Sequence, residues 1–230
     1  MKFKLIILIG LMLIGFKGHS QDAIRFGITA NPGLVWVKPD NTNISSNGVR
    51  FGFDFGLVFD YVFGQQDRYA FNSGINLLIS GARLKGTAAD SSGVTSDLTA
   101  RINYLEIPLT VKLRSNEVGY LTYYGQLGLT PQFAVRSRAD YTLTDSLGMV
   151  TADVKNAKLR DIPVEPVTID KVRPFNLGLV VEAGIEYAMT ENTALVGGIF
   201  FNAGFLDMFK DADSERVVSR SIGLRISVLF

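Results

Sequence analysis

Carboxylates are the side chains of this chain best suited to chemistry, because histidine and cysteine are nearly absent. The sequence contains no cysteine and a single histidine, His19, near the amino terminus. The chain after residue 20 therefore has no imidazole to act as a general base, no thiol nucleophile and no soft metal ligand. These absences exclude most familiar catalytic and metal-binding arrangements.

Two groups of carboxylates remain. Glu182 and Glu186 are four residues apart on one face of a predicted strand, which separates them by about 13 Å at a rise of ~3.3 Å per residue. They are too far apart to act on one bond. Asp207, Asp211 and Asp213 lack the glycine and glutamate spacing of an EF-hand loop. We therefore expect no catalytic residue, no metal site and no cofactor; an enzyme that uses carboxylates alone is the remaining alternative.

The segments that carry the charged residues alternate with a period of two, as β-strands do. In Tyr104 to Leu113, leucine, isoleucine and valine occupy one face, while Glu106 and Lys112 share the other. Residues 48–63 and 175–187 repeat the pattern, and the apolar face of 48–63 is rich in phenylalanine. The segments predicted as strands are 24–37, 48–63, 68–84, 101–114, 120–135, 175–189, 193–205 and 216–230.

The connections between the predicted strands are alternately short and long. The short ones are 64–67, 115–119 and 190–192, and the long, polar ones are 38–47, 85–100, 136–174 and 206–215. Outer-membrane barrels have short periplasmic turns and longer extracellular loops. The spacing therefore predicts that both chain ends lie on the periplasmic side.

The long extracellular loop 136–174 contains a candidate extra hairpin. Tyr141–Thr144 and Met149–Val154 flank the turn sequence Asp-Ser-Leu-Gly, and as wall strands they would give a ten-stranded barrel. Alternate residues onward from Met149 are polar, and the opposite face becomes polar at Asn156. Such a strand does not suit a lipid-facing wall, so we expect any hairpin here to lie above the membrane.

The amino terminus has the features of a secretory signal peptide. Lys2 and Lys4 precede an apolar run from Leu5 to Phe16, and the small residues Gly18 and Ser20 stand at the −3 and −1 positions of a cleavage site. The apolar run is shorter than the ~20 residues that cross a bilayer as a helix, which argues against the alternative of a membrane anchor. We expect a signal peptide over 1–20 and one barrel domain over 21–230.

Alternation alone would also fit a soluble β-sandwich or a secreted lipocalin-like barrel. Most predicted strands, however, are much longer than the usual ~5–6 residues of a globular sheet, and their number is even, as in bacterial membrane barrels. The sequence thus predicts an all-β protein, an eight-stranded antiparallel up-and-down transmembrane β-barrel of the outer membrane, preceded by a cleavable signal peptide. Its lipid-facing surface would contact outer-membrane lipid.

The charge balance gives no reason to expect a nucleic acid partner. The chain has 23 basic and 22 acidic residues, and three of the basic ones lie in the predicted signal peptide. A nucleic-acid-binding protein usually carries a basic surface, so this class of partner is excluded.

The polar face of each strand must point into the lumen if the apolar face contacts lipid. Eight strands enclose a lumen just wide enough to be filled by side chains. We therefore expect the inward charges to pair and fill the lumen as a structural network, with an ion or proton path as the alternative. The charged residues assigned to this network are Arg25, Arg50, Asp54, Glu106, Lys112, Glu182, Glu186 and Arg225. The glycines expected to leave room for them are Gly52, Gly56, Gly178, Gly184 and Gly223.

Several segments resemble the PorT-like family of outer-membrane β-barrels. The resemblance rests on Tyr-Leu-Glu-Ile-Pro at 104–108, the glycine-containing 120–133, Glu-Ala-Gly-Ile-Glu-Tyr at 182–187 and the closing 224–230. It implies an integral outer-membrane protein that the barrel-assembly machinery inserts through a carboxyl-terminal signal. The residues that match such a signal are Ser221, Gly223, Ile226, Val228 and Phe230. The namesake of the family is associated with protein secretion.

Function is therefore expected in surfaces rather than in catalysis. The first hypothesis is a non-enzymatic structural or protein-interaction component, linked to protein secretion, whose extracellular loops or periplasmic turns bind other proteins. The alternative is a porin-like passage for small solutes or ions, which the charged inward face would line.

Overall fold

The computed structural model describes residues 24–39, 44–46, 48–64, 67–87, 94–158, 171–210 and 217–230. The predicted signal peptide lies outside these residues. No helix among them is long and apolar enough to cross a membrane.

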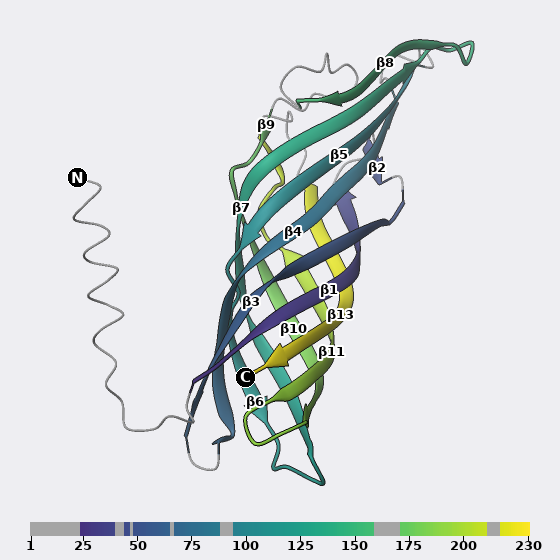
Figure 1. The fold of residues 1–230 in the computed structure, drawn as a ribbon. Helices are drawn as coiled ribbons and strands as arrows, with labels where there is room; N and C mark the ends of the chain where they lie inside the picture. The colour runs from purple at the N-terminus through teal and green to yellow at the C-terminus, as the bar shows by residue number, and fades with distance from the viewer. Residues whose placement is uncertain are drawn as a thin grey trace, which may run out of the picture.

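Nine of the described strands form one closed antiparallel ring (Figure 1). Its walls are β1 (Ile24–Pro39), β3 (Arg50–Phe63), β4 (Tyr69–Thr87), β5 (Thr95–Glu106) with its continuation β6 (Leu109–Arg114), β7 (Leu121–Thr144), β10 (Phe175–Ala188), β11 (Ala194–Gly204) and β13 (Val217–Leu229). The pairing of β7 with β10 and of β1 with β13 closes the ring. Counting β5 and β6 as one wall strand, the barrel has eight strands, as predicted.

The break between β5 and β6 falls at Pro108, which has no backbone N–H to donate. Ile107 N still donates to Pro131 O at 3.0 Å, and both segments pair with β4 and β7. The wall is therefore continuous across the break.

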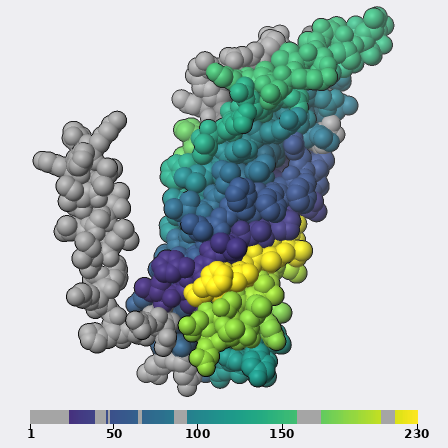
Figure 2. Space-filling model, in the orientation of Figure 1, coloured from purple at the N-terminus to yellow at the C-terminus, as the bar shows by residue number. Residues whose placement is uncertain are grey.

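The first and last wall strands lie side by side, as the space-filling view also shows (Figure 2). Their ends are joined by reciprocal hydrogen bonds, from Phe26 N to Phe230 O at 3.1 Å and from Phe230 N to Phe26 O at 2.6 Å. The short connections 115–120 and 189–193 lie at this same end of the barrel. By the rule for outer-membrane barrels, we call it the periplasmic end.

A band of exposed apolar residues surrounds the barrel. The outward side chains of β3 are typical: Phe51, Phe55, Leu57 and Tyr61 are all exposed, Leu57 by 62%. A soluble protein rarely exposes so large a continuous apolar surface, and lipid provides its natural contact. Closing the sheet satisfies the backbone N–H and C=O groups inside the bilayer, where water is absent.

The extra hairpin exists and lies outside the ring, so the ten-stranded alternative is wrong for the described residues. β8 (Val150–Ala157) pairs with the far end of β7 and projects beyond the barrel at the end opposite the carboxyl terminus (Figure 1). Asp145 Oδ1 accepts the N–H groups of Leu147 and Met149, both at 2.9 Å, and Gly148 has a φ of 79°. These features close the turn that the sequence indicated.

Three wall strands extend further than predicted at the extracellular end. β4 reaches residue 87, β5 begins at 95 and β7 ends at 144, so parts of the predicted loops 85–100 and 136–174 are strand. Short two-stranded pieces complete this end: β2 (Ile44–Ser46) pairs with β4, and β9 (Lys171–Val172) pairs with β12 (Phe209–Lys210).

The polarity of β4 and β5 is reversed toward their extracellular ends. Leu84, Leu98 and Ile102 point inward and are fully buried, whereas Arg83 and Arg101 point outward. Above the bilayer the outer face meets water and the inner face meets other strands, so the inside becomes apolar and the outside polar. The extensions themselves are rich in polar residues, which is why the sequence predicted loops there.

A test of the membrane boundary follows from the change of polarity. Leu57→Arg places a charge in the middle of the lipid-facing band and is expected to destabilise the barrel by about 2–4 kcal/mol. Ser146→Arg, in the exposed hairpin turn, is the control and is expected to change stability by less than about 0.5 kcal/mol. Equilibrium unfolding in lipid vesicles measures both, and equal effects would contradict the assigned boundary.

Candidate functional site in the barrel lumen

The lumen is filled in layers, the first of which lies at the periplasmic end and consists of charged side chains. Lys112 Nζ is 2.7 Å from Asp60 Oδ2 and 3.1 Å from Glu186 Oε1. Arg25 contacts the same two carboxylates, each at 3.0 Å, and Arg114 contacts Glu186 at 3.0 Å. We call these five residues the periplasmic charge layer. Three cations share two carboxylates, so each carboxylate is bound by at least two cations.

The second layer centres on Glu182, which is buried, forms an ion pair with Arg225 and accepts hydrogen bonds from two neutral side chains. Arg225 Nε lies 2.8 Å from Glu182 Oε2, Gln126 Nε2 donates to the same oxygen at 2.8 Å, and Tyr124 OH donates to Oε1 at 2.6 Å. Glycines provide the space for the phenol: a Cβ added at Gly184 or Gly198 would be 2.7 or 2.5 Å from the Tyr124 hydroxyl.

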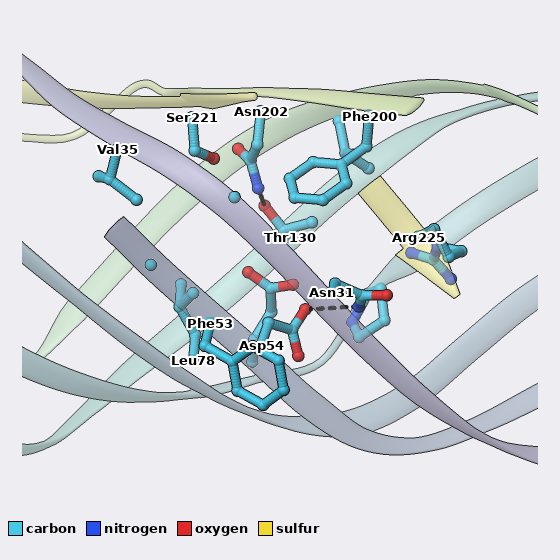
Figure 3. Close-up of a pocket in the computed structure, with 15 residues that line it drawn as sticks. Asn31, Val35, Phe53, Asp54, Leu78, Thr130, Phe200, Asn202, Ser221 and Arg225 are labelled. Atoms are coloured by element: carbon cyan, nitrogen blue, oxygen red, sulfur yellow. Dashed lines mark hydrogen bonds between the residues drawn. The ribbon is translucent and has the colours of Figure 1, made fainter. Parts of the chain in front are cut away.

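Two further carboxylates, Asp54 and Glu106, are held mainly by amides. Asn31 Nδ2 donates to Asp54 Oδ2 at 3.0 Å, and Gln132 Nε2 donates to Glu106 Oε2 at 2.6 Å. Both carboxylates line a cavity of about 30 Å³ together with Arg225. Figure 3 shows the hydrogen bond between Asp54 and Asn31, which are cross-strand partners on β3 and β1. A volume of this size holds about one water molecule, and it is not a passage.

The third layer, toward the extracellular end, is apolar and was not predicted. Met208 enters it from the connection between β11 and β13 and is 1% exposed. The buried residues of this cluster, which we call the apolar plug, are Val37, Ala82, Leu84, Leu98, Ala100, Ile102, Tyr104, Ala139, Tyr141, Met208 and Val217. A hydrated ion would have to lose its water to pass through such a layer, at high cost.

The structure brings most of the sequence-assigned charged residues into these layers. Arg25, Lys112 and Glu186 meet in the periplasmic charge layer, and Glu182 and Arg225 meet in the second. Glu182 and Glu186, which the sequence predicted to be too far apart to act on one bond, belong to different layers. Asp54 and Glu106 point into the lumen and are buried there.

Arg50 is the assigned residue that lies elsewhere. Its guanidinium is within 3.3 Å of a Cβ added at the outward-facing Gly81, and Nη1 donates to Ala100 O at 3.3 Å. The charged groups that influence it are Arg83, Arg101 and Asp140, which are also outward-facing. The pairing of β3 with β4 ends at Phe53, so the side chain at position 50 is free to leave the lumen.

Some lumen residues were missed, although a signal existed for each. Asp60 shares the inward face of β3 with Asp54, and Arg114 shares that of Lys112. The amides and hydroxyls that complete the network, such as Tyr124 and Gln126, follow from the same alternation on β7. Counting charged residues alone overlooked these neutral partners.

The glycines that the sequence assigned to the lumen are close to neighbouring side chains. Added Cβ atoms at Gly56, Gly178 and Gly223 would lie 2.5, 2.3 and 2.6 Å from side-chain atoms of Asn76, Asn202 and Phe200.

The residues that match an insertion signal lie on both faces of β13. Ser221 and Gly223 face the lumen, whereas Ile226, Val228 and the terminal Phe230 share the outward face. Their role as an insertion signal stays a prediction.

The arrangement of the lumen is suited to structural pairing rather than to binding a metal. Among the described residues, no group of three or more histidine, cysteine, aspartate or glutamate side chains is placed to hold a metal ion. Each lumen carboxylate already accepts from arginine, lysine, tyrosine or an amide. The chemistry that this geometry supports is mutual neutralisation of buried charge.

The buried pair Arg225–Glu182 is expected to contribute strongly to the stability of the barrel. If one partner is removed, the other remains buried and water cannot take its place. Arg225→Met should destabilise the barrel by about 3–5 kcal/mol, and Arg225→Met with Glu182→Gln should cost less than the sum of the single changes. Lys155→Met, which removes an exposed pair with Asp153, is the control and should cost at most about 1 kcal/mol. Unfolding in denaturant measures all four; additive effects would show that the pair is not coupled.

Comparison with solved structures finds similar chains of low identity. Neisserial surface protein A is 16% identical, with a TM-score of 0.40 and coverage of 87% of this chain and 96% of that chain. OprG from Pseudomonas aeruginosa is 15% identical, with a TM-score of 0.47 and coverage of 90% and 96%. Ail from Yersinia pestis is 14% identical, with a TM-score of 0.33 and coverage of 89% and 98%. No curated protein matches the chain.

A family model gives the assignment. The model described as the outer membrane protein beta-barrel domain matches residues 19–210, which is most of the chain. It agrees with the closed ring of strands and the apolar outer band, and it places the protein in the outer membrane. The chain belongs to the outer membrane protein beta-barrel domain family.

Proposed function

We propose that the protein is a non-enzymatic outer-membrane barrel that holds a β-hairpin above the membrane as a binding surface for another protein. The observation that carries this proposal is the exposure of apolar residues at the hairpin, well away from the lipid-facing band. Leu147, Met149 and Val150 are 83%, 65% and 61% exposed. Apolar residues that are clustered and exposed to water are characteristic of interaction sites.

The filled lumen supports the same proposal. The periplasmic charge layer, the Glu182 layer and the apolar plug occupy successive levels of the barrel. A barrel closed in this way suits an anchor more than a channel. The resemblance to the PorT-like family suggests the class of partner: a component of a protein-secretion apparatus in the outer membrane or outside it.

Site-specific crosslinking tests the interaction. A photoreactive residue at position 147 should capture a partner in intact cells, and Met149→Ser with Val150→Ser should reduce the yield about tenfold by removing the apolar contact. A photoreactive residue at Val118, which is 68% exposed and lies at the periplasmic end, is the control for position. Capture at 118 and none at 147 would contradict the proposal.

A porin-like passage is the second candidate, and one observation favours it. The periplasmic mouth of the barrel contains a polar cavity of about 420 Å³ lined by residues that include Arg25, Arg114, Glu117 and Glu186. This cavity ends at the periplasmic charge layer. The passage would therefore require the layers above to open.

Planar-bilayer recording separates the two candidates. The purified barrel is expected to show no stepwise conductance, because the apolar plug blocks the lumen. Met208→Ala with Ile102→Ala thins the plug and is the test for a hidden passage. Steady conductance in the unchanged protein would overturn the closed-barrel proposal in favour of the passage.

A further inference from the structure

A cluster of arginines lies on the outer face of the barrel, at the extracellular edge of the lipid-facing band. Arg83 on β4, Arg101 on β5 and Arg138 on β7 all face outward, and the guanidinium of Arg50 lies over Gly81 beside them. We call these four residues the arginine cluster. Arg136, also outward and exposed, extends it along β7.

The arginine cluster has more positive charge than its protein neighbours balance. Arg101 and Arg138 are direct cross-strand partners on one face, and like charges in this position repel. Arg83 and Arg101 both repel the positive charge of Arg50. Among the described residues whose charge acts on Arg50, Asp140 is the one carboxylate.

Asp140 is already occupied by other partners. It forms an ion pair with Arg101, and its Oδ1 accepts the backbone N–H of Asn156 at 2.8 Å. Asp97, on the same outer face of β5, lies directly opposite Lys85, and Arg138 donates to Asn156 O at 3.4 Å. On this outer face of the described chain the arginines therefore outnumber the carboxylates. An external anion would relieve their repulsion.

The height of the arginine cluster indicates what that anion is. On β4 the last apolar outward residue is Ile79, and Gly81 and Arg83 follow on the same face. Arg101, opposite Gly81, and Arg83 are therefore about 7 and 13 Å beyond Ile79 along the strand, or about 5 to 10 Å along the membrane normal for the usual strand tilt. The polar headgroup layer is about 5–8 Å thick on each side of a bilayer.

We propose that the arginine cluster binds the phosphate groups of anionic lipids in the outer leaflet. Guanidinium groups bind phosphate through paired, charge-assisted hydrogen bonds, and arginines that face outward at headgroup depth meet lipid before they meet any soluble partner. The site uses the outer wall of β4, β5 and β7, and it is separate from the lumen and from the exposed hairpin tip.

Lipid binding by the purified barrel tests this proposal. In native mass spectrometry, the probe is diphosphorylated lipid A, compared with the same lipid without its phosphates. Arg83→Gln/Arg101→Gln/Arg138→Gln is expected to weaken binding of the phosphorylated lipid by roughly 100-fold, at about 1 kcal/mol for each arginine near a membrane surface. Binding of the dephosphorylated lipid should not change.

A matched variant controls for net charge. Lys38→Gln/Arg68→Gln/Arg173→Gln removes the same number of positive charges from exposed positions outside the arginine cluster, and it should bind as the unchanged protein does. Correct folding of each variant is checked by its resistance to unfolding in detergent. Equal binding of both lipids, an equal loss in both triple variants, or displacement of the lipid by an equimolar amount of inorganic phosphate would each overturn the proposal. So would crosslinking of the arginine cluster to an acidic protein with no lipid bound.

Discussion

Closure of the sheet between β1 and β13 is the constraint on which the rest of the structure depends. An open sheet would leave the backbone groups of two edge strands without partners in a medium that lacks water. Once the ring is closed, every side chain must face either lipid or lumen. The lipid side admits apolar residues such as Leu57 and Ile226, so the charged residues of the membrane-spanning region are confined to the interior.

A closed ring of eight strands then determines what the interior contains. Its bore is too narrow for bulk water, so charges there must neutralise one another. Glycines such as Gly184 and Gly198 make this possible, because they let Tyr124 reach Glu182 on the neighbouring strand. Where the strands leave the bilayer, the outer face becomes polar and the inner face apolar. There the apolar plug fills the lumen, as the charge pairs do within the membrane.

The sequence was sufficient for the architecture because period-two alternation and the lengths of the connections are local signals. The eight wall strands, the hairpin outside the ring and the inward face of Glu106, Lys112 and Glu182 were all predicted in this way. The apolar plug was not, because recognising it requires knowing where each strand leaves the membrane. Arg50 shows a second limit: alternation gives the direction of a Cα–Cβ bond, whereas a long side chain at the end of a strand can carry its charge to the other face.

The position of Arg225 on β13 has a consequence for the stability of the closed ring. Glu182 is on β10 and Arg225 is on β13, and both strands pair with β11. The strand that closes the ring with β1 therefore also carries the cation of a buried carboxylate. A barrel in which β13 is displaced would lose a row of backbone hydrogen bonds and leave Glu182 without that cation, and this makes a partly open barrel unfavourable compared with the closed one.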